Sequence, residues 1–290
     1  MIPASFEYSA PTTLSHAIAL LQQHGTDAKI LAGGQSLIPL MKLRMAAPKH
    51  LIDLNRISEL AYIRESDGHL TIGALTRESQ IDSSELIRQK YPLLADTAAV
   101  IGDPLVRNMA TVGGNLAHAD PANDHGATML ALRAEVVATG PNGARTIALT
   151  DFFTGLFTTA LNPDEILTEI RIPIPPPGSG GAYLKVERKV GDFAAAAVAV
   201  QLTLDGNVCK GVGIGLTNVG STPIEASRAE QALEGQAPTD ENIQKAAALA
   251  AEQAEPVDDL RGSADYKRSL IRVLTGRALR LAIARAKGEH

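Results

Sequence analysis

Two short segments, each with a pair of adjacent glycines, hold the residue types best suited to bind a phosphate. LAGGQS spans Leu31 to Ser36, and TVGGN spans Thr111 to Asn115. Glycine lets a ligand approach the backbone closely, and successive backbone N–H groups in such a turn attract anions. A tight turn explains one glycine pair equally well. Two pairs, with hydroxyl and amide side chains beside them, predict a clamp that holds a pyrophosphate with neutral dipoles only.

The residues after the second glycine pair raise the alternative of a metal site. His118, Asp120, Asp124 and His125 lie close together in the sequence. Their spacing matches neither the H-E-x-x-H signature nor an EF-hand loop. A proline and an asparagine between them instead indicate a turn, where aspartate side chains accept hydrogen bonds from backbone N–H groups. We therefore expect no metal here, and the sequence gives neither histidine a role.

Other signatures of nucleotide binding and of hydrolysis are missing. The chain contains no G-x-G-x-x-G, no G-x-x-x-x-G-K-[ST] and no G-x-S-x-G. Gly211, Gly213 and Gly215 alternate with apolar residues and lead into no immediate helix, so a glycine-rich strand is favoured over a cofactor loop. Asp53 and Asp192 are interpreted as structural or capping carboxylates rather than acid/base groups.

The composition excludes several classes of protein. The 290 residues carry a formal net charge of -5, and only 3% are aromatic, with no tryptophan. Lys and Arg are scattered, so neither a basic patch nor a stacking platform for nucleic acid is expected. The N-terminal residues show no basic region followed by an apolar core, so no signal peptide is expected, and no apolar run approaches the roughly 20 residues that cross a bilayer. We therefore expect a cytoplasmic protein with no transmembrane segment and no nucleic-acid partner.

Cysteine usage limits the redox chemistry of the chain. Cys209 is the only cysteine. An intrachain disulfide is therefore impossible, and so is an iron–sulfur cluster held by about four thiolates. If the function requires such a cluster, another chain must carry it.

Hydrophobic periodicity and turn residues predict three domains, residues 1–56, 57–177 and 178–290. The elements expected in the first, an α/β unit, are a helix capped by Thr13 or Ser15 and ending near Gly25, a strand over 28–32, a helix over 37–44 capped by Ser36, and a strand over 50–55. Those expected in the second are a strand over 69–75, a helix over 92–100, and a hairpin of 135–139 with 146–149.

Prolines and glycines crowd residues 171–181, which indicates a domain boundary, with a long surface loop as the alternative. The elements expected beyond it are antiparallel strands over 182–189, 195–204 and 208–217, a helix begun by a capping box at Thr222–Glu225 and ended at Gly235, and helices over 240–254 and 264–287. The last helix has an apolar stripe that should face the core, or else a partner: Leu270, Val273, Leu274, Ala278, Leu281 and Ala282.

Taken together, the motifs resemble a known family. AGGQSLIPLMKLR with HLIDLN, then IGDPLVRNMATVGGNLAHADPANDH, then EILTEIRIP and KVERKVGDFAAAAVAV occur in the order and spacing of the FAD-binding medium subunits of the molybdenum hydroxylases. That family includes xanthine dehydrogenase and aerobic carbon monoxide dehydrogenase, and the medium subunit of the latter is the nearest match. The resemblance implies an α+β, FAD-binding fold of the vanillyl-alcohol-oxidase (PCMH-like) type: two α/β subdomains and a C-terminal antiparallel sheet domain with helices.

The resemblance also implies the residues that bind FAD. The pyrophosphate would lie at Ala32, Gly33, Gly34, Gln35 and Ser36 and at Thr111, Gly113, Gly114 and Asn115. Asp124 would bond hydroxyls of the flavin nucleotide, and Ile101, Leu161, Lys185 and Phe193 would contact the flavin. A cation at Lys185 would raise the flavin potential, whereas an exposed strand lysine is the alternative reading. Gln35 stands where relatives often have histidine, and Phe193 where they often have tyrosine, which weakens the case for carbon monoxide as substrate.

By the same resemblance, the chain is the FAD-carrying electron-transfer subunit of a heterotrimeric oxidoreductase. It would receive electrons from [2Fe-2S] clusters of a small partner chain and pass them to an external acceptor, while a large chain with the molybdopterin cofactor oxidises the substrate. A dimer of heterotrimers is expected. The alternatives are a self-contained flavin dehydrogenase or oxidase, and a non-catalytic scaffold module in which the glycine turns are purely structural.

Overall fold

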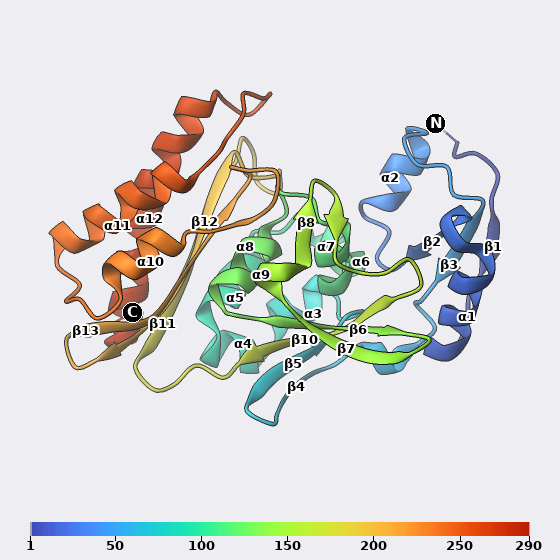
Figure 1. Ribbon diagram of the computed structural model, residues 1–290, viewed down its shortest axis with the longest axis horizontal. Coiled ribbons are helices and arrows are strands. Elements are labelled where there is room, and N and C mark those ends of the chain that lie inside the picture. The colour runs from blue at the N-terminus through green and yellow to red at the C-terminus, as the bar shows by residue number, and fades with distance from the viewer. Residues whose placement is uncertain (1, 290) are drawn as a thin grey trace.

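Within its described residues the protein has three larger β-sheets and one two-stranded ribbon with helices packed around them, and Figure 1 shows the larger sheets as neighbours from the blue N-terminal part to the red C-terminal part. The computed structural model describes residues 2–289. The fold is α+β, as expected, with a parallel first sheet and antiparallel second and third sheets. Across the described residues, no helix combines the length and apolar character needed to cross a membrane.

The first sheet carries the first glycine pair. Its strands lie in the order β1-β3-β2, all parallel, and its elements are β1 (Glu7–Ser9), α1 (Leu14–His24), β2 (Ala28–Leu31), α2 (Leu37–Lys42) and β3 (His50–Asp53). Thr13 caps α1 by accepting from the N–H of His16 at 3.3 Å, as predicted. The predicted cap at Ser36 is wrong. Its backbone is already helical and its side chain makes no capping bond, because a cap residue needs an extended backbone to turn its oxygen back on the helix.

The second sheet has five antiparallel strands in the order β4-β5-β10-β6-β7. These are β4 (Ile63–Ser66), β5 (His69–Gly73), β6 (Glu135–Gly140), β7 (Gly143–Ala148) and β10 (Ile166–Pro173). The predicted hairpin is present as β6 and β7. The helices of this part are α3 (Glu78–Ser83), α4 (Glu85–Lys90), α5 (Pro92–Ala99), α6 (Pro104–Met109), α7 (Val112–His118), α8 (Asp124–Ala131) and α9 (Leu149–Phe152), and a small ribbon is formed by β8 (Phe153–Gly155) and β9 (Thr158–Thr159).

The third sheet is sandwiched between helices. Its strands are β11 (Ser179–Val186), β12 (Ala196–Asp205), β13 (Val208–Thr217) and β14 (Ile224–Glu225), and α10 (Ser227–Leu233), α11 (Asp240–Gln253) and α12 (Ala264–Ala286) follow. In Figure 1 the orange and red helices cover one face of this sheet, while α5 and α8 pack on the other. Gly213 and Gly215 lie in β13, as predicted, where an added Cβ would meet the backbone of Ala131 and Ala127 in α8. Gly213 and Gly215 therefore let α8 approach the sheet.

Two sequence predictions fail in this part of the chain. Thr222–Glu225 does not begin a helix, because Ile224 and Glu225 pair with β13 as β14 and the helix starts only at Ser227. Pairing with the edge of the sheet therefore determines the conformation of these residues, and the local capping pattern does not. In α12, Val273 is 48% exposed and lies outside the buried stripe, whereas Leu274, Ala278 and Ala282 are buried as predicted.

The second and third sheets share one core. Tyr183, Ala197 and Ala199 from the third sheet are buried in the same cluster as Leu93 and Met129 from the helices beside the second. The division into three domains at 56 and 177 stays a prediction, but the last two sheets are packed together through α5 and α8. Residues on α5 and α8 are consequently held in place by both the second and the third sheet.

Candidate functional site

The two glycine pairs, far apart in the sequence, lie against each other. An added Cβ on Gly33 would lie 2.8 Å from Cα of Ala110, just before the second segment, and would collide with the carbonyl of Met109. An added Cβ on Gly114 would lie 3.5 Å from Cβ of Ala32. Glycine is thus required at Gly33 because the two backbones touch there.

The second glycine pair does not repeat the strand-and-turn arrangement of the first. It lies in the first turn of α7, where Thr111 is the cap and its Oγ1 accepts from the N–H of Gly114 at 3.2 Å. An added Cβ on Gly113 would lie 2.5 Å from Cβ of Ala74, so this glycine lets the helix pack on the second sheet. Only Gly114 faces the first segment.

The polar groups around these segments suit an anionic dinucleotide. Among the described residues, no protein acceptor is recorded for the backbone N–H groups of Gly33, Gly34 and Gln35. Gly34 has a φ of +75°, which turns successive N–H groups toward one side. The side-chain carbonyl of Asn115 is buried and has no hydrogen-bond partner. Buried polar groups are normally bonded, so this arrangement fits a ligand that accepts from the first segment and donates to Asn115.

Sequence reasoning missed two side chains that join the segments. Asn55 follows β3 and donates from Nδ2 to the carbonyl of Ala32 at 2.9 Å. Arg77 precedes α3 and donates to both Oδ1 of Asn55 and the carbonyl of Met109. The available signal was position: each residue lies shortly after a strand that leads toward a glycine segment.

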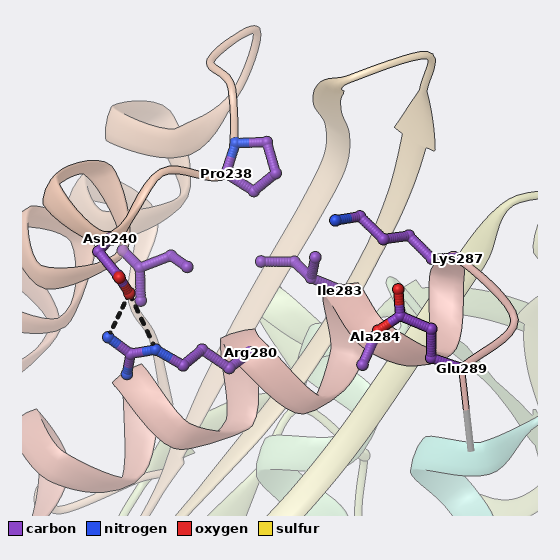
Figure 2. Close-up of a pocket in the computed structure, with 8 residues that line it drawn as sticks. Pro238, Asp240, Arg280, Ile283, Ala284, Lys287 and Glu289 are labelled. Atoms are coloured by element: carbon purple, nitrogen blue, oxygen red, sulfur yellow. Dashed lines mark hydrogen bonds and ion pairs between the residues drawn. The ribbon is translucent and has the colours of Figure 1, made fainter.

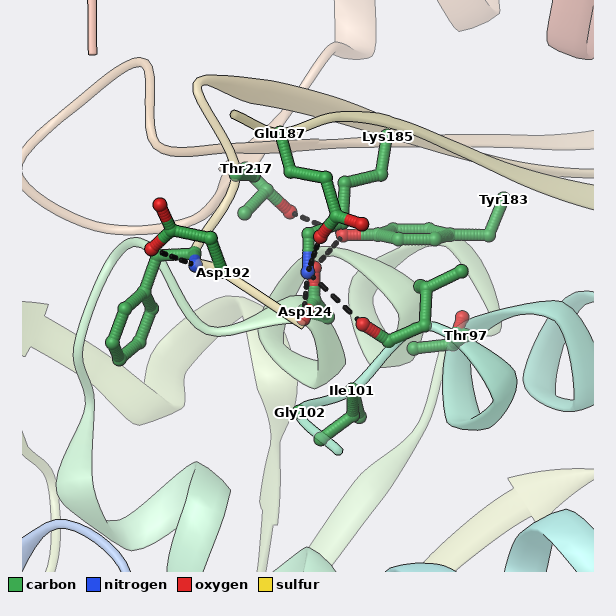
Figure 3. A network of polar contacts seen from close by, with 12 residues as sticks. Thr97, Ile101, Gly102, Asp124, Tyr183, Lys185, Glu187, Asp192 and Thr217 are labelled. Carbon is green, nitrogen blue, oxygen red and sulfur yellow. Dashed lines mark hydrogen bonds and ion pairs between the residues drawn. The ribbon is translucent and has the colours of Figure 1, made fainter. Parts of the chain in front are cut away.

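A second cluster of polar side chains is buried between α8 and the third sheet, and Figure 3 shows its members pointing toward one another. Asp124 accepts from the hydroxyl of Tyr183 at 2.6 Å and from Nζ of Lys185 at 3.1 Å. Lys185 also donates to the carbonyl of Val100 at 3.1 Å and pairs with Glu187 at 3.3 Å. Tyr183 and Lys185 are two apart on β11 and so share the face toward α8.

Burial controls the electrostatics of this cluster. The side chain of Lys185 is 3% exposed and that of Asp124 is 8% exposed. Burial raises the pKa of the Asp124 carboxyl although Lys185 and Tyr183 oppose the shift. Burial, and then the charge of Asp124, raise the pKa of Tyr183 well above its ordinary value. The reading of Lys185 as an exposed strand lysine is wrong, and its ammonium already faces two carboxylates rather than standing as a free cation.

Of three further predicted flavin contacts, Ile101 and Phe193 lie beside this cluster. Ile101 is buried next to Val100, whose carbonyl binds Lys185. Phe193 ends a loop that reaches the same turn, since an added Cβ on Gly191 would lie 2.9 Å from the carbonyl of Gly102. Leu161 packs against the shared core beyond β9, on the side of α7. Ile101, Asp124, Lys185 and the Phe193 loop are therefore neighbours, whereas for Leu161 the structure gives packing against the shared core.

Asp192 and Arg261 fix the Phe193 loop. The Arg261 guanidinium donates to Asp192 at 3.1 Å and holds the pKa of that carboxyl at about 2. The same guanidinium lies 5.5 Å from the ring centroid of Phe193. Asp192 is structural, as predicted, and so is Asp53, which accepts from the N–H of Asn55 at 2.8 Å.

The two histidines without a predicted role point to different places. His125 is fully buried and its Nε2 lies 2.8 Å from Oε2 of Glu78. His118 packs against Phe157 with ring centroids 5.3 Å apart, and burial lowers its pKa. Within residues 2–289, no three His, Cys, Asp or Glu side chains gather as metal ligands would. The two imidazole rings therefore have different neighbours and do not belong to one cluster.

A surface hollow between α11 and α12 lies apart from these residues. Figure 2 shows Asp240 and Arg280 on its wall, paired at 2.8 Å, with Pro238 on the loop before α11 and Lys287 at the C-terminal end of α12. None of the predicted site residues lines it. It offers no grouping of convergent polar atoms comparable to the two sites above.

The class of protein follows from family comparison. Residues 4–175 match the family model described as the FAD binding domain in molybdopterin dehydrogenase, and residues 181–282 match the CO dehydrogenase flavoprotein C-terminal domain. The chain therefore belongs to the family of FAD-binding subunits of molybdopterin dehydrogenases, as its motifs predicted.

Within that family, the chain is similar to carbon monoxide dehydrogenase medium chains. It is 47% identical to that of Hydrogenophaga pseudoflava, with 98% of this chain and 99% of the relative covered, and 46% identical to that of Afipia carboxidovorans, with 99% and 100% covered. The structure of a Hydrogenophaga pseudoflava carbon monoxide dehydrogenase that lacks the Mo-pyranopterin moiety superimposes with a TM-score of 0.96 at 49% identity, covering 98% of this chain and 99% of that one.

Proposed function

We propose that this chain binds FAD non-covalently and relays electrons from iron–sulfur clusters of a small partner chain to an external acceptor. A large molybdopterin partner would oxidise the substrate, and two heterotrimers would associate. The observation that carries the proposal is the contact between the two glycine segments, with unbonded backbone donors on one and the unpartnered, buried Asn115 carbonyl on the other. The single cysteine supports the division of labour, because this chain cannot hold a thiolate-ligated cluster.

Each part of the chain has a distinct task in this proposal. The N–H groups of Gly33 to Gln35 would donate to the pyrophosphate, and Thr111 to Asn115 would close over it. Asp124, fixed by Tyr183 and Lys185, would orient the flavin nucleotide, with Ile101, Leu161 and Phe193 as apolar contacts. FAD, when bound, supplies a carrier that exchanges electrons with both one-electron and two-electron partners.

The Asp124 cluster modifies the role expected for Lys185. An ammonium flanked by Asp124 and Glu187 adds little net positive charge to its surroundings. We therefore assign Lys185 to holding Asp124 in one orientation rather than to raising the flavin potential as a free cation.

The rival of a self-contained flavin enzyme predicts substrate turnover by this chain alone. The near-complete coverage of relatives that are themselves medium chains favours a subunit. The large partner chain would determine the substrate of the complex. This chain specifies neither that substrate nor the final electron acceptor. Turnover of any substrate by the purified chain without partners would favour the rival.

The test is purification of this chain together with its co-expressed partners. We expect three kinds of polypeptide and flavin absorbance that corresponds to one FAD per copy of this chain. Gly114→Val should abolish the flavin absorbance, because the added side chain fills the space between Thr111 and Ala32. Gly276→Ala is the matched control, because this helical glycine has no heavy atom within 3.4 Å of an added Cβ. Full FAD content in the Gly114→Val complex would contradict the assigned site, and a colourless wild-type complex would contradict FAD binding.

A further inference from the structure

The bridge of Asn55 and Arg77 grips the two glycine segments at the place where they touch. Its Asn55 end bonds the carbonyl of Ala32, and its Arg77 end bonds the carbonyl of Met109. That second carbonyl is the atom nearest to an added Cβ on Gly33. The bridge therefore spans the same contact that requires glycine, and it fixes how far apart the segments lie.

Arg77 also brings a charge that nothing nearby neutralises through an ion pair. Among residues 2–289, no carboxylate lies within 4.0 Å of its guanidinium nitrogens. Asp53, whose charge acts on Arg77, is itself engaged by Asn55 and by the hydroxyl of Tyr8. An arginine offers five N–H donors in a planar fork that matches phosphate oxygens. The bonds to Asn55 and Met109 engage one donor each, and among the described residues no protein acceptor is recorded for the remaining N–H groups.

We propose that Arg77 is a positioning residue for the diphosphate of FAD, holding the two glycine segments at the spacing that receives it and supplying positive charge beside it. The inference deepens the proposed function and rests on it. The sequence predicted that neutral dipoles alone hold the diphosphate, whereas in this proposal the Arg77 guanidinium adds one positive charge to them. Asn55 belongs to the same device, because it carries the link from the guanidinium to the first segment.

The experiment measures FAD affinity in the complex of this chain with its co-expressed partners, after removal and titration of the flavin, at low and at high salt. Arg77→Met removes a charge-assisted contact and should weaken FAD binding by roughly 10- to 150-fold. It should also flatten the salt dependence of the dissociation constant, because a charge contact with phosphate is lost. Arg77→Lys should restore the salt dependence and recover part of the affinity, since lysine keeps the charge but not the fork.

Matched variants separate charge, geometry and folding. Arg64→Met removes an exposed arginine that lies over Tyr62 and should leave FAD affinity unchanged. Asn55→Ala keeps the charge but cuts the link to Ala32, so affinity should fall while the salt dependence remains; this variant also serves if Arg77→Met does not assemble. The dissociation constant of ADP, which shares the diphosphate, should weaken in Arg77→Met by about the same factor as that of FAD, whereas that of adenosine should not change, which places the loss at the diphosphate.

The outcomes distinguish the inference from the function on which it rests. Wild-type affinity and salt dependence in both Arg77→Met and Asn55→Ala would overturn the inference while FAD binding stands. A wild-type complex that binds no FAD would overturn both.

Discussion

Removing the ammonium of Lys185 tests whether the buried cluster around Asp124 is held by its ion pair. In Lys185→Met the methionine fills a similar volume, but Asp124 keeps only the hydroxyl of Tyr183, and the carbonyl of Val100 loses its donor. Breaking a buried ion pair by removing one partner costs about 3–5 kcal/mol. With the lysine 3% exposed, solvent replaces little of the loss, so we expect about 4 kcal/mol. That is a large part of the roughly 5–15 kcal/mol by which proteins are stable.

The loss should depend on pH with a definite sign. Burial already raises the folded-state pKa of Asp124 above its unfolded value, and removing the lysine raises it further. A carboxyl of this kind favours the fold in its protonated form, so its contribution is full below the unfolded pKa and is lost as the pH rises through the folded pKa. Lys185→Met should therefore be more stable at pH 5 than at pH 8, by a larger margin than the wild type.

Urea unfolding followed by far-ultraviolet circular dichroism measures both effects, since the chain has no tryptophan to report by fluorescence. With a slope of about 3 kcal/mol per M urea, the midpoint should fall by roughly 1.3 M. The double variant Lys185→Met with Asp124→Asn should regain part of the loss, because the buried carboxylate is gone as well. A midpoint equal to that of the wild type at both pH values would refute the assignment of a stabilising buried pair.

Three further predictions concern groups outside that cluster. Asp192→Asn should lower the free energy of unfolding at neutral pH. In the wild type, Arg261 depresses the pKa of Asp192 from 3.8 to about 2, so this stabilisation is lost as the pH falls through that range. Urea midpoints between pH 4 and pH 2 should therefore fall less steeply in the variant than in the wild type. Cys209, buried and with its pKa raised to about 11, should react with a thiol reagent only after unfolding, and rapid labelling of the native chain would contradict its burial. Glu78→Ala should cost about 1–3 kcal/mol in urea because His125 Nε2 loses its buried partner, whereas Glu78→Gln, which keeps an acceptor, should cost less; equal losses would argue against the pairing.

Much of the fold was predictable because local patterns and packing agree. The hairpin at Gly140–Gly143, the long strands around Asp205–Asn207 and the helix capped by Thr13 each combine a turn or cap residue with the correct periodicity. The capping box at Thr222–Glu225 failed because the edge of the preceding strand, β13, offered β pairing to the same residues. Local preference is weak when a sheet edge lies within reach.

The site was predictable in its glycines and not in its surroundings. Two glycine pairs can be seen in the sequence, but their contact is made by the fold, so the need for Gly33 opposite Met109 could not be read from either segment. Lys185 reads as an ordinary strand lysine until α8 brings Asp124 to the same face of the sheet. Arg77 belongs to no sequence motif. Its guanidinium finds its partners, Asn55 and the carbonyl of Met109, only when the fold brings their segments together.

The shared core of the second and third sheets has a consequence for how the chain comes apart. Residues 174–178, between β10 and β11, are largely exposed, with Ile174 at 40%, and would be open to a protease. Contacts nevertheless join the parts of the chain before and after residues 174–178. Arg285 in α12 donates to Asp96 in α5 at 2.6 Å, and Tyr183, which follows these residues, is buried in the core formed mostly by residues that precede them. A cut in this linker should leave two fragments that travel as one particle and separate only in denaturant. The covalent joint is thus dispensable once the protein has folded, and the two fragments behave as one body.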